Sequence, residues 1–133
     1  MSSPLRLFTT LIRTHHITSR KKLQRVKKAA AHRSIPYVLV RYGGSPGIMY
    51  AESADGESLS SWVSAVHELR YKDFQCAQKP AAREVLLGQE TKAPSSSAPF
   101  NEVESVAAFG DEMERRGLGS WWKIGMGYES QGW

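Results

Sequence analysis

The sequence has almost no cysteine and no long hydrophobic run. Its single cysteine, Cys76, cannot form a disulfide within the chain or a multi-cysteine zinc site, which is typical of proteins from reducing compartments. No apolar stretch approaches the roughly 18 residues that suggest a membrane-spanning helix. With 41% hydrophobic residues in 133, the chain can build one compact core but not two. The sequence therefore predicts one soluble domain with appendages.

Acidic residues are absent from the N-terminal part of the chain. Before Glu52 there are ten lysines and arginines and no aspartate or glutamate, so residues 1–51 carry a charge of +10 and the remainder −5. Such asymmetry predicts a polyanionic partner for the N-terminal part, with nucleic acid ahead of an anionic membrane surface. The alternative interpretation is a solvated cationic face that has no partner.

Hydrophobic patterning in the first part of the chain predicts two strands separated by a helix. Residues 7–12 are apolar and β-branched and predict a strand. Thr18 or Ser19 can cap a helix over residues 20–32, whose apolar positions form one narrow stripe. The apolar run over 37–42 predicts the second strand.

The following residues predict a hairpin, a second helix and a last strand. Residues 43–47 contain three glycines and a proline, and with the strand over 48–51 they predict a hairpin with a wide turn. Ser58 can cap an amphipathic helix that runs to residue 70, and residues 71–77 alternate as a short strand does. The order indicates an α+β fold, a ferredoxin-like βαββαβ sandwich. A four-stranded antiparallel sheet then has two helices on one face and leaves the other face open.

Beyond this unit the composition changes. We assign residues 1–80 to the ferredoxin-like domain and the serine- and proline-rich residues 81–100 to a linker or surface loop. Asn101 and Glu104 have the spacing of a capping box, which predicts a helix from there to Arg116. Residues 101–133 are therefore expected to form a helical and aromatic C-terminal extension that packs on the domain.

Several short motifs between about Thr14 and Phe74 follow one another in a distinctive order. They are His15-His16-Ile17, Ser19-Arg20-Lys21-Lys22, Gly43-Gly44, Ser45-Pro46-Gly47, Ile48-Met49-Tyr50 leading to Glu52, and Trp62 before Leu69-Arg70-Tyr71. In this order they resemble the C-terminal domain of a tri-snRNP pre-mRNA splicing factor, which also occurs in RWD-domain-containing proteins of unknown function. Ser53 stands where that family has the glycine of a Glu-Gly pair. The resemblance implies a ferredoxin-like fold and, for the splicing member, contact with RNA.

The basic helix is the main candidate site. Three of its cations occupy the first turn, where the positive end of the helix dipole disfavours them, so they are expected to serve something other than helix stability. We predict RNA binding, mainly through the phosphate backbone. Simple solubility is the alternative. His16 is a candidate for a further phosphate contact, with a capping or packing role as the alternative. If the strand face that carries Arg41 is exposed, bases could stack there; the alternative is aromatic core packing or burial of that face under the C-terminal helix. The helix residues are Arg20, Lys21, Lys22, Arg25, Lys27 and Lys28.

A protein-interaction adapter is the second functional hypothesis. Trp121, Trp122 and Tyr128 lie in an aromatic-rich tail, and together with an open sheet face they could bind a partner protein. The same aromatic side chains could instead cover the chain's own sheet. The two functions differ in salt dependence, because phosphate binding weakens steeply as salt rises whereas an apolar interface does not.

Signals for chemistry are weak. His15 and His16 are adjacent and point to opposite faces of a strand, so they cannot chelate one metal together. The glycine-rich turn lacks the lysine and the following helix of a phosphate loop. We therefore expect no enzyme activity, no cofactor and no metal. A nuclear or cytoplasmic location is favoured; the acid-free N-terminus with Arg6 and Arg13 leaves a mitochondrial transit segment as the alternative.

Overall fold

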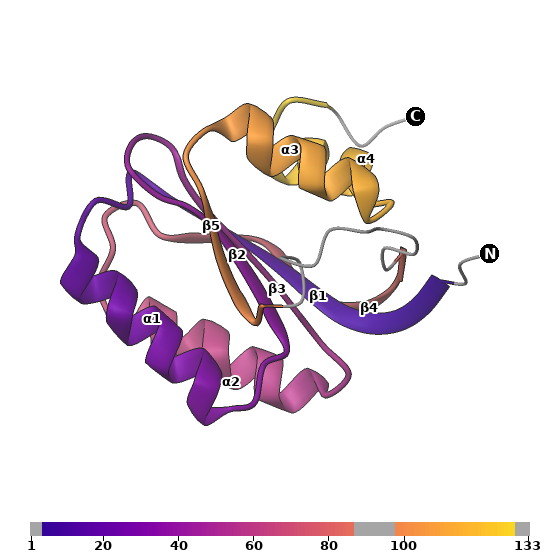
Figure 1. Ribbon diagram of the computed structural model, residues 1–133, viewed down its shortest axis with the longest axis horizontal. Coiled ribbons are helices and arrows are strands. Elements are labelled where there is room, and N and C mark those ends of the chain that lie inside the picture. Colours follow the sequence, from indigo (N-terminus) through magenta and orange to yellow (C-terminus); the bar gives the residue numbers. More distant parts are fainter. Residues whose placement is uncertain (1–3, 87–97, 130–133) are drawn as a thin grey trace.

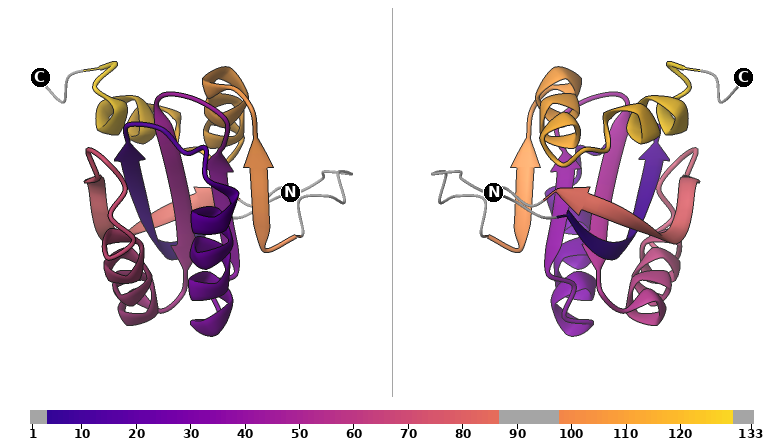
Figure 2. Two further views of the ribbon diagram at one scale, coloured as in Figure 1. Left: turned by 90° about the vertical axis from the view of Figure 1, so that its left-hand side faces the viewer. Right: turned by 90° about the vertical axis from the view of Figure 1, so that its right-hand side faces the viewer.

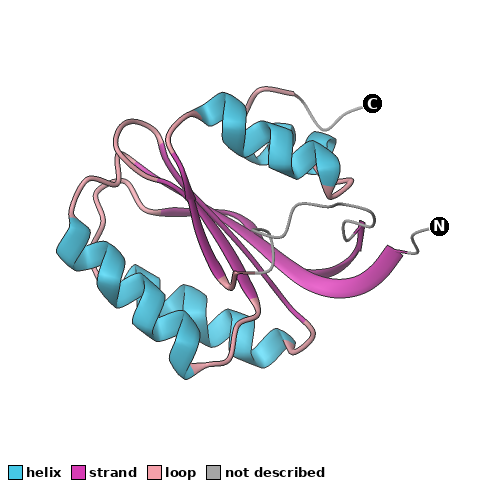
Figure 3. Ribbon diagram, in the orientation of Figure 1, coloured by secondary structure: helices cyan, strands magenta, loops and turns pink. Residues whose placement is uncertain are grey.

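A five-stranded mixed sheet lies between two layers of helices (Figures 1 and 3). The computed structural model describes residues 4–86 and 98–129. The elements, in chain order, are β1 (Pro4–Thr14), α1 (Arg20–His32), β2 (Tyr37–Arg41), β3 (Gly47–Ser53), α2 (Gly56–His67), β4 (Gln75–Leu86), β5 (Phe100–Val103), α3 (Val106–Arg115) and α4 (Gly119–Met126).

The strand order is β4-β1-β3-β2-β5, with β4 and β5 at opposite edges (Figure 2). All neighbours among β1 to β4 are antiparallel. β5, however, pairs in parallel with β2, and Val38 lies opposite Phe100. The α+β class is thus confirmed, whereas the prediction of a purely antiparallel, four-stranded sheet is wrong. The pairing partner of β5 lies some sixty residues away, so no local pattern indicates it.

The capping box predicted at Asn101 is also wrong, because this residue pairs with a distant strand that no local pattern indicates. Asn101 lies in β5, and its side-chain amide donates to the Ala98 carbonyl at 2.8 Å. The helix begins instead at Val106, where the Ser105 hydroxyl accepts a hydrogen bond from the Ala108 N–H at 3.0 Å. A serine three residues before a free N–H satisfies the helix start as well as the predicted asparagine would have done.

Two other boundaries differ from the prediction. The second helix starts at Gly56, because Asp55 and not Ser58 is its N-cap; the Ser58 hydroxyl donates to the Asp55 carboxylate at 2.7 Å. The last strand of the unit is longer than residues 71–77: β4 pairs with β1 as far as Leu86 opposite Pro4, and so extends into the segment predicted as a linker. Pairing with the long β1 keeps these residues extended although their own alternation is weak.

The first face of the sheet packs against α1 and α2, as predicted. α1 contributes Leu23, Val26 and Ala30, and Trp62 of α2 lies fully buried at the centre of this core. The Trp62 indole N–H donates to the Val26 carbonyl at 3.4 Å, joining the two helices. The apolar stripe of α1 therefore faces inward and its charged residues face solvent.

The second face of the sheet, which the predicted βαββαβ unit leaves open, is covered by α3 and α4, as in the alternative in which the C-terminal aromatic side chains cover the chain's own sheet. Phe109 and Met113 of α3 and Trp121 and Trp122 of α4 pack on it, and Tyr50 from β3 meets Trp121 edge to face with ring centroids 5.9 Å apart. Figure 2 shows the two layers on opposite sides of the strands. Both faces of the sheet are closed by the chain itself.

A buried ion pair fastens α3 to the sheet. The Arg116 guanidinium donates to both carboxylate oxygens of Glu52 at 2.9 Å, and the Tyr50 hydroxyl donates to the same carboxylate. The guanidinium also lies 3.7 Å from the centre of the Tyr37 ring. Burial raises the pKa of Glu52, which Arg116 and Tyr50 offset only in part. Removal of either Glu52 or Arg116 would therefore leave the other charged group buried without its counter-ion.

The start of α1 yields a stability prediction. The Ser19 hydroxyl accepts from the Lys22 N–H at 3.1 Å and is the cap of a first turn that holds no acidic residue. Ser19→Ala should lower the free energy of unfolding by about 1 kcal/mol, measured by urea denaturation. Ser19→Asp should at least restore the wild-type value, because a carboxylate also favours the helix dipole. An unchanged midpoint in Ser19→Ala would contradict the cap.

Candidate nucleic-acid interface

Three of the six predicted cations of α1 are held by neighbouring groups. Arg20 forms a two-fold hydrogen bond with the Glu102 carboxylate, both at 2.8 Å, and its guanidinium lies 3.9 Å from the centre of the Tyr42 ring. The hydrogen bonds from Arg20 lower the pKa of Glu102, which keeps that carboxylate ionised. Glu102 belongs to β5, the strand that the sequence did not predict. Arg20 is therefore partly neutralised as a phosphate ligand.

Lys22 and Lys27 are held more weakly, by aromatic rings. The Lys22 ammonium lies 4.9 Å from the centre of the Tyr71 ring and 3.4 Å from the Arg70 carbonyl. Lys27 lies 5.8 Å from the Phe100 ring. Cation–π contacts of this kind at a surface are worth about 0.5–1 kcal/mol, so these ammonium groups can still reach an anion.

The other three cations form one exposed row. Lys21, Arg25 and Lys28 stand at positions i, i+4 and i+7 of α1, hence on one face of the helix. Successive members are separated by about 6 and 4.5 Å along the helix axis. None of them forms an ion pair with a carboxylate in the part of the chain that the structure describes. We call these three residues the α1 row.

The two further predicted contacts, His16 and Arg41, lie in different environments. His16 is exposed and lies just before the helix start, with its ring 5.0 Å from that of His15. Arg41 is half-buried, and its guanidinium donates to the Glu104 carbonyl at 3.1 Å and the Pro46 carbonyl at 3.2 Å. Arg41 thus holds two loops in place. Tyr37 and Leu39 on the same face of β2 pack under α3 and α4, so the condition for base stacking beside Arg41 is not met and the alternative of burial under the C-terminal helices applies.

The aromatic residues of the tail are mostly inside. Trp121 and Trp122 are 7% and 5% exposed, whereas Tyr128 is 54% exposed and meets Trp122 edge to face. A partner protein could reach the two tryptophans only by displacing α4. Of the three residues proposed for the adapter surface, only Tyr128 is accessible.

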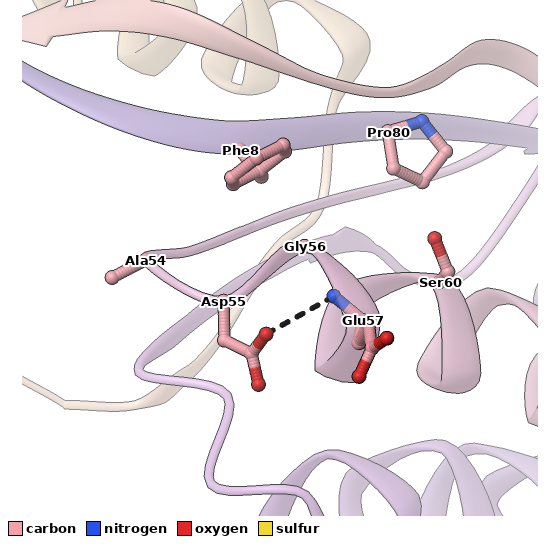
Figure 4. A pocket seen from close by; sticks show the side chains of 7 residues that line it. All are labelled: Phe8, Ala54, Asp55, Gly56, Glu57, Ser60 and Pro80. Atoms are coloured by element: carbon pink, nitrogen blue, oxygen red, sulfur yellow. Dashed lines mark hydrogen bonds between the residues drawn. The ribbon is translucent and has the colours of Figure 1, made fainter.

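A hollow of about 830 Å³ lies between β1 and the start of α2 (Figure 4). Phe8 and Pro80 form its apolar side, and Asp55 and Glu57 its acidic rim. The Asp55 carboxylate accepts from the Glu57 N–H at 3.1 Å, so Asp55 serves as the N-cap of α2. Among the described residues, no three His, Cys, Asp or Glu side chains are placed to hold a metal ion, and no helix is long and apolar enough to cross a membrane.

Sequence reasoning missed a polar cleft at the end of the sheet near α1. Arg13, Ser45 and Gln75 converge there from β1, the β2–β3 loop and β4, beside His15 and Asp73. The only local signal is Arg13 itself, a charged residue inside an apolar strand. No family model matches the chain, and no curated protein matches it.

Proposed function

We propose that this domain binds RNA through the phosphate backbone and that the α1 row is its main contact. The observation that carries the proposal is the arrangement of Lys21, Arg25 and Lys28 on one exposed helix face, unpaired among the described residues. Cations that have no protein partner are free to displace the condensed counterions of a nucleic acid, which is the main source of affinity that does not depend on base sequence. His16 adds an exposed polar side chain at the helix start, and Lys22 and Lys27 flank the row.

The arrangement of the first six elements supports the same proposal. Strand order β4-β1-β3-β2, with antiparallel neighbours and with α1 and α2 on one face, is that of a ferredoxin-like unit. We infer that residues 4–86 form such a unit, related to the splicing-factor domain that the sequence resembles. Because helices cover both faces of the sheet, RNA contacts the exposed face of α1 and not the strands. Base specificity is slight, because these contacts are to the phosphate backbone.

A salt titration tests the proposal. If the three residues of the α1 row meet phosphates, the logarithm of the affinity for a single-stranded RNA should fall against the logarithm of salt concentration with a slope of about −2. The double variant Lys21→Glu/Lys28→Glu should bind at least about tenfold more weakly near 50 mM salt, with a shallower slope. Fluorescence anisotropy of a labelled RNA of random sequence measures both quantities.

The matched control changes the same net charge elsewhere. Arg6 and Lys79 are exposed on β1 and β4, away from α1. Arg6→Glu/Lys79→Glu should keep most of the wild-type affinity, because it alters the total charge by the same amount but leaves the α1 row intact. Equal losses of RNA affinity in the two double variants would mean that net charge, and not the α1 row, determines binding. Absence of RNA binding by the wild type would contradict the proposal itself.

Most of the surface proposed for the adapter function is not accessible to a partner. α3 and α4 occupy the sheet face that it needed, and Trp121 and Trp122 are buried. An apolar partner would bind with little dependence on salt, so the same titration separates the two functions.

A further inference from the structure

The cleft at the end of the sheet has the donors of an anion site. It has a volume of about 480 Å³, and its polar lining consists of Arg13, Thr14, His15, Ser45, Asp73 and Gln75. The Thr14 hydroxyl already donates to the His16 carbonyl at 3.1 Å, which leaves Arg13, His15, Ser45 and Gln75 as possible donors to a ligand. Asp73 is the only carboxylate among the described residues of the lining, and it lies 3.4 Å from Nδ1 of His15.

Arg13 is the central group. Strand pairing places it between Gln75 of β4 and Ile48 of β3, and Ile48 belongs to the core under α3 and α4. Arg13 and Gln75 therefore project from the same face of the sheet, beyond the edge of that core. Arg13 is half-buried, yet its guanidinium makes no hydrogen bond or ion pair with any residue that the structure describes. Its guanidinium nitrogens are not among the buried polar atoms that lack a partner, so solvent reaches them and they are available to donate to a ligand in the cleft.

His15 and Asp73 complete the cleft. The contact to Asp73 uses Nδ1, and the His15 N–H donates to the Lys72 carbonyl at 2.8 Å, so the loop before β4 fixes the histidine. Nε2 is then the ring nitrogen left for a ligand. Asp73 opposes an anion by its charge and lies 3.4 Å from His15 Nδ1, whereas Arg13 has no carboxylate partner among the described residues. The donors of the cleft outnumber its one carboxylate, which favours an anion that can accept several hydrogen bonds, and a phosphate matches the planar fork of an arginine.

The cleft is joined to the start of α1. The Gly43 N–H donates to the Ile17 carbonyl at 2.7 Å, and the Ile17 N–H donates to the Gly44 carbonyl at 3.4 Å. These bonds hold the β2–β3 loop, which carries Ser45, against the segment that leads into the helix. Exposed His16 lies on that segment. A nucleic-acid backbone that leaves the α1 row at Lys21 thus meets cationic or donor groups around this end of the domain.

We infer that this cleft is a second phosphate subsite, in which Arg13, His15 Nε2, Ser45 and Gln75 hold one phosphate group of the RNA bound along α1. The inference rests on the proposed function for the identity of the polyanion. The binding of a phosphate group, whatever molecule carries it, is inferred from the cleft alone.

Two titrations test it separately. The first adds inorganic phosphate to the wild-type protein at fixed ionic strength and follows backbone amide shifts by NMR. Saturable shifts are expected at Arg13, His15 and Ser45, absent in Arg13→Gln and retained in Lys21→Glu/Lys28→Glu. Acetate at equal concentration should produce smaller shifts. No saturable shift with phosphate, or a larger effect of acetate, would overturn the inference, the latter in favour of a carboxylate-binding site.

The second titration uses single-stranded RNA. Arg13→Gln should weaken binding about tenfold, the loss expected for a hydrogen-bonded charge contact, and should reduce the salt slope by about 0.7. Ser45→Ala, an exposed loop position that does not endanger folding, should have a smaller effect in the same direction. The control Lys79→Gln should bind as the wild type does.

The two experiments distinguish the two claims. Phosphate shifts in the cleft together with wild-type affinity for RNA in both Arg13→Gln and Ser45→Ala would overturn the subsite as an RNA contact, whereas the proposed function would stand. Phosphate shifts with no RNA binding by the wild type would overturn the proposed function and leave the cleft supported as a phosphate site.

Discussion

Glu52→Ala should lower the free energy of unfolding by about 3–5 kcal/mol, the usual cost of leaving one partner of a buried ion pair alone. Arg116 is 8% exposed, and without Glu52 two of its hydrogen bonds have no acceptor in the described structure. Glu112 retains its bond to Nε at 3.0 Å and limits the loss. Urea denaturation at neutral pH measures the effect, as a lower midpoint with an unchanged slope.

Two comparisons isolate the contribution of burial. Glu102→Ala breaks a surface ion pair in which two nitrogens of Arg20 donate to the two carboxylate oxygens, and should shift the midpoint far less, because exposed pairs contribute little. Glu52→Leu combined with Arg116→Met removes both charges and should recover most of the stability that Glu52→Ala loses. If Glu52→Ala were no more harmful than Glu102→Ala, the buried pair would not fasten α3 to the sheet.

Phe109→Ala should also cost about 3–5 kcal/mol, since it empties a fully buried position. Phe109 stacks against Trp122, with ring centroids 6.1 Å apart, and lies over the same sheet that α1 and α2 cover from the other side. Because the two cores share one sheet, the loss should affect the whole domain. Unfolding curves from far-ultraviolet circular dichroism and from tryptophan fluorescence should shift together and coincide.

Tyr128→Ala is the matched control for Phe109. Tyr128 is an aromatic residue of the same C-terminal layer, and it also contacts Trp122 but is 54% exposed. Its removal should change the midpoint only slightly. A fluorescence transition that precedes the loss of circular dichroism in Phe109→Ala would mean that α3 and α4 unfold independently of the sheet.

Local patterns in the sequence were sufficient for α1, α2 and the β2–β3 hairpin. Residues 20–32 have a serine cap, a narrow apolar stripe and a stop at Pro36, all of which act within one or two helical turns. The hairpin depends on a short turn between two apolar strands. The charge asymmetry and the basic helix are likewise properties of adjacent residues, so the sequence by itself identified the element that carries the proposed interface.

Only the tertiary structure decided which cations of that helix are free. Arg20 is paired because β5 adds Glu102 to the edge beside it, 82 positions along the chain. Arg41 is held by the Glu104 and Pro46 carbonyls, and Arg13 meets its cleft only where three separate segments converge. The covering of the second sheet face and the pairing of Glu52 with Arg116 have the same origin. A side chain's neighbours across a sheet are set by strand pairing between distant segments, and the periodicity of a single segment carries no information about its partner.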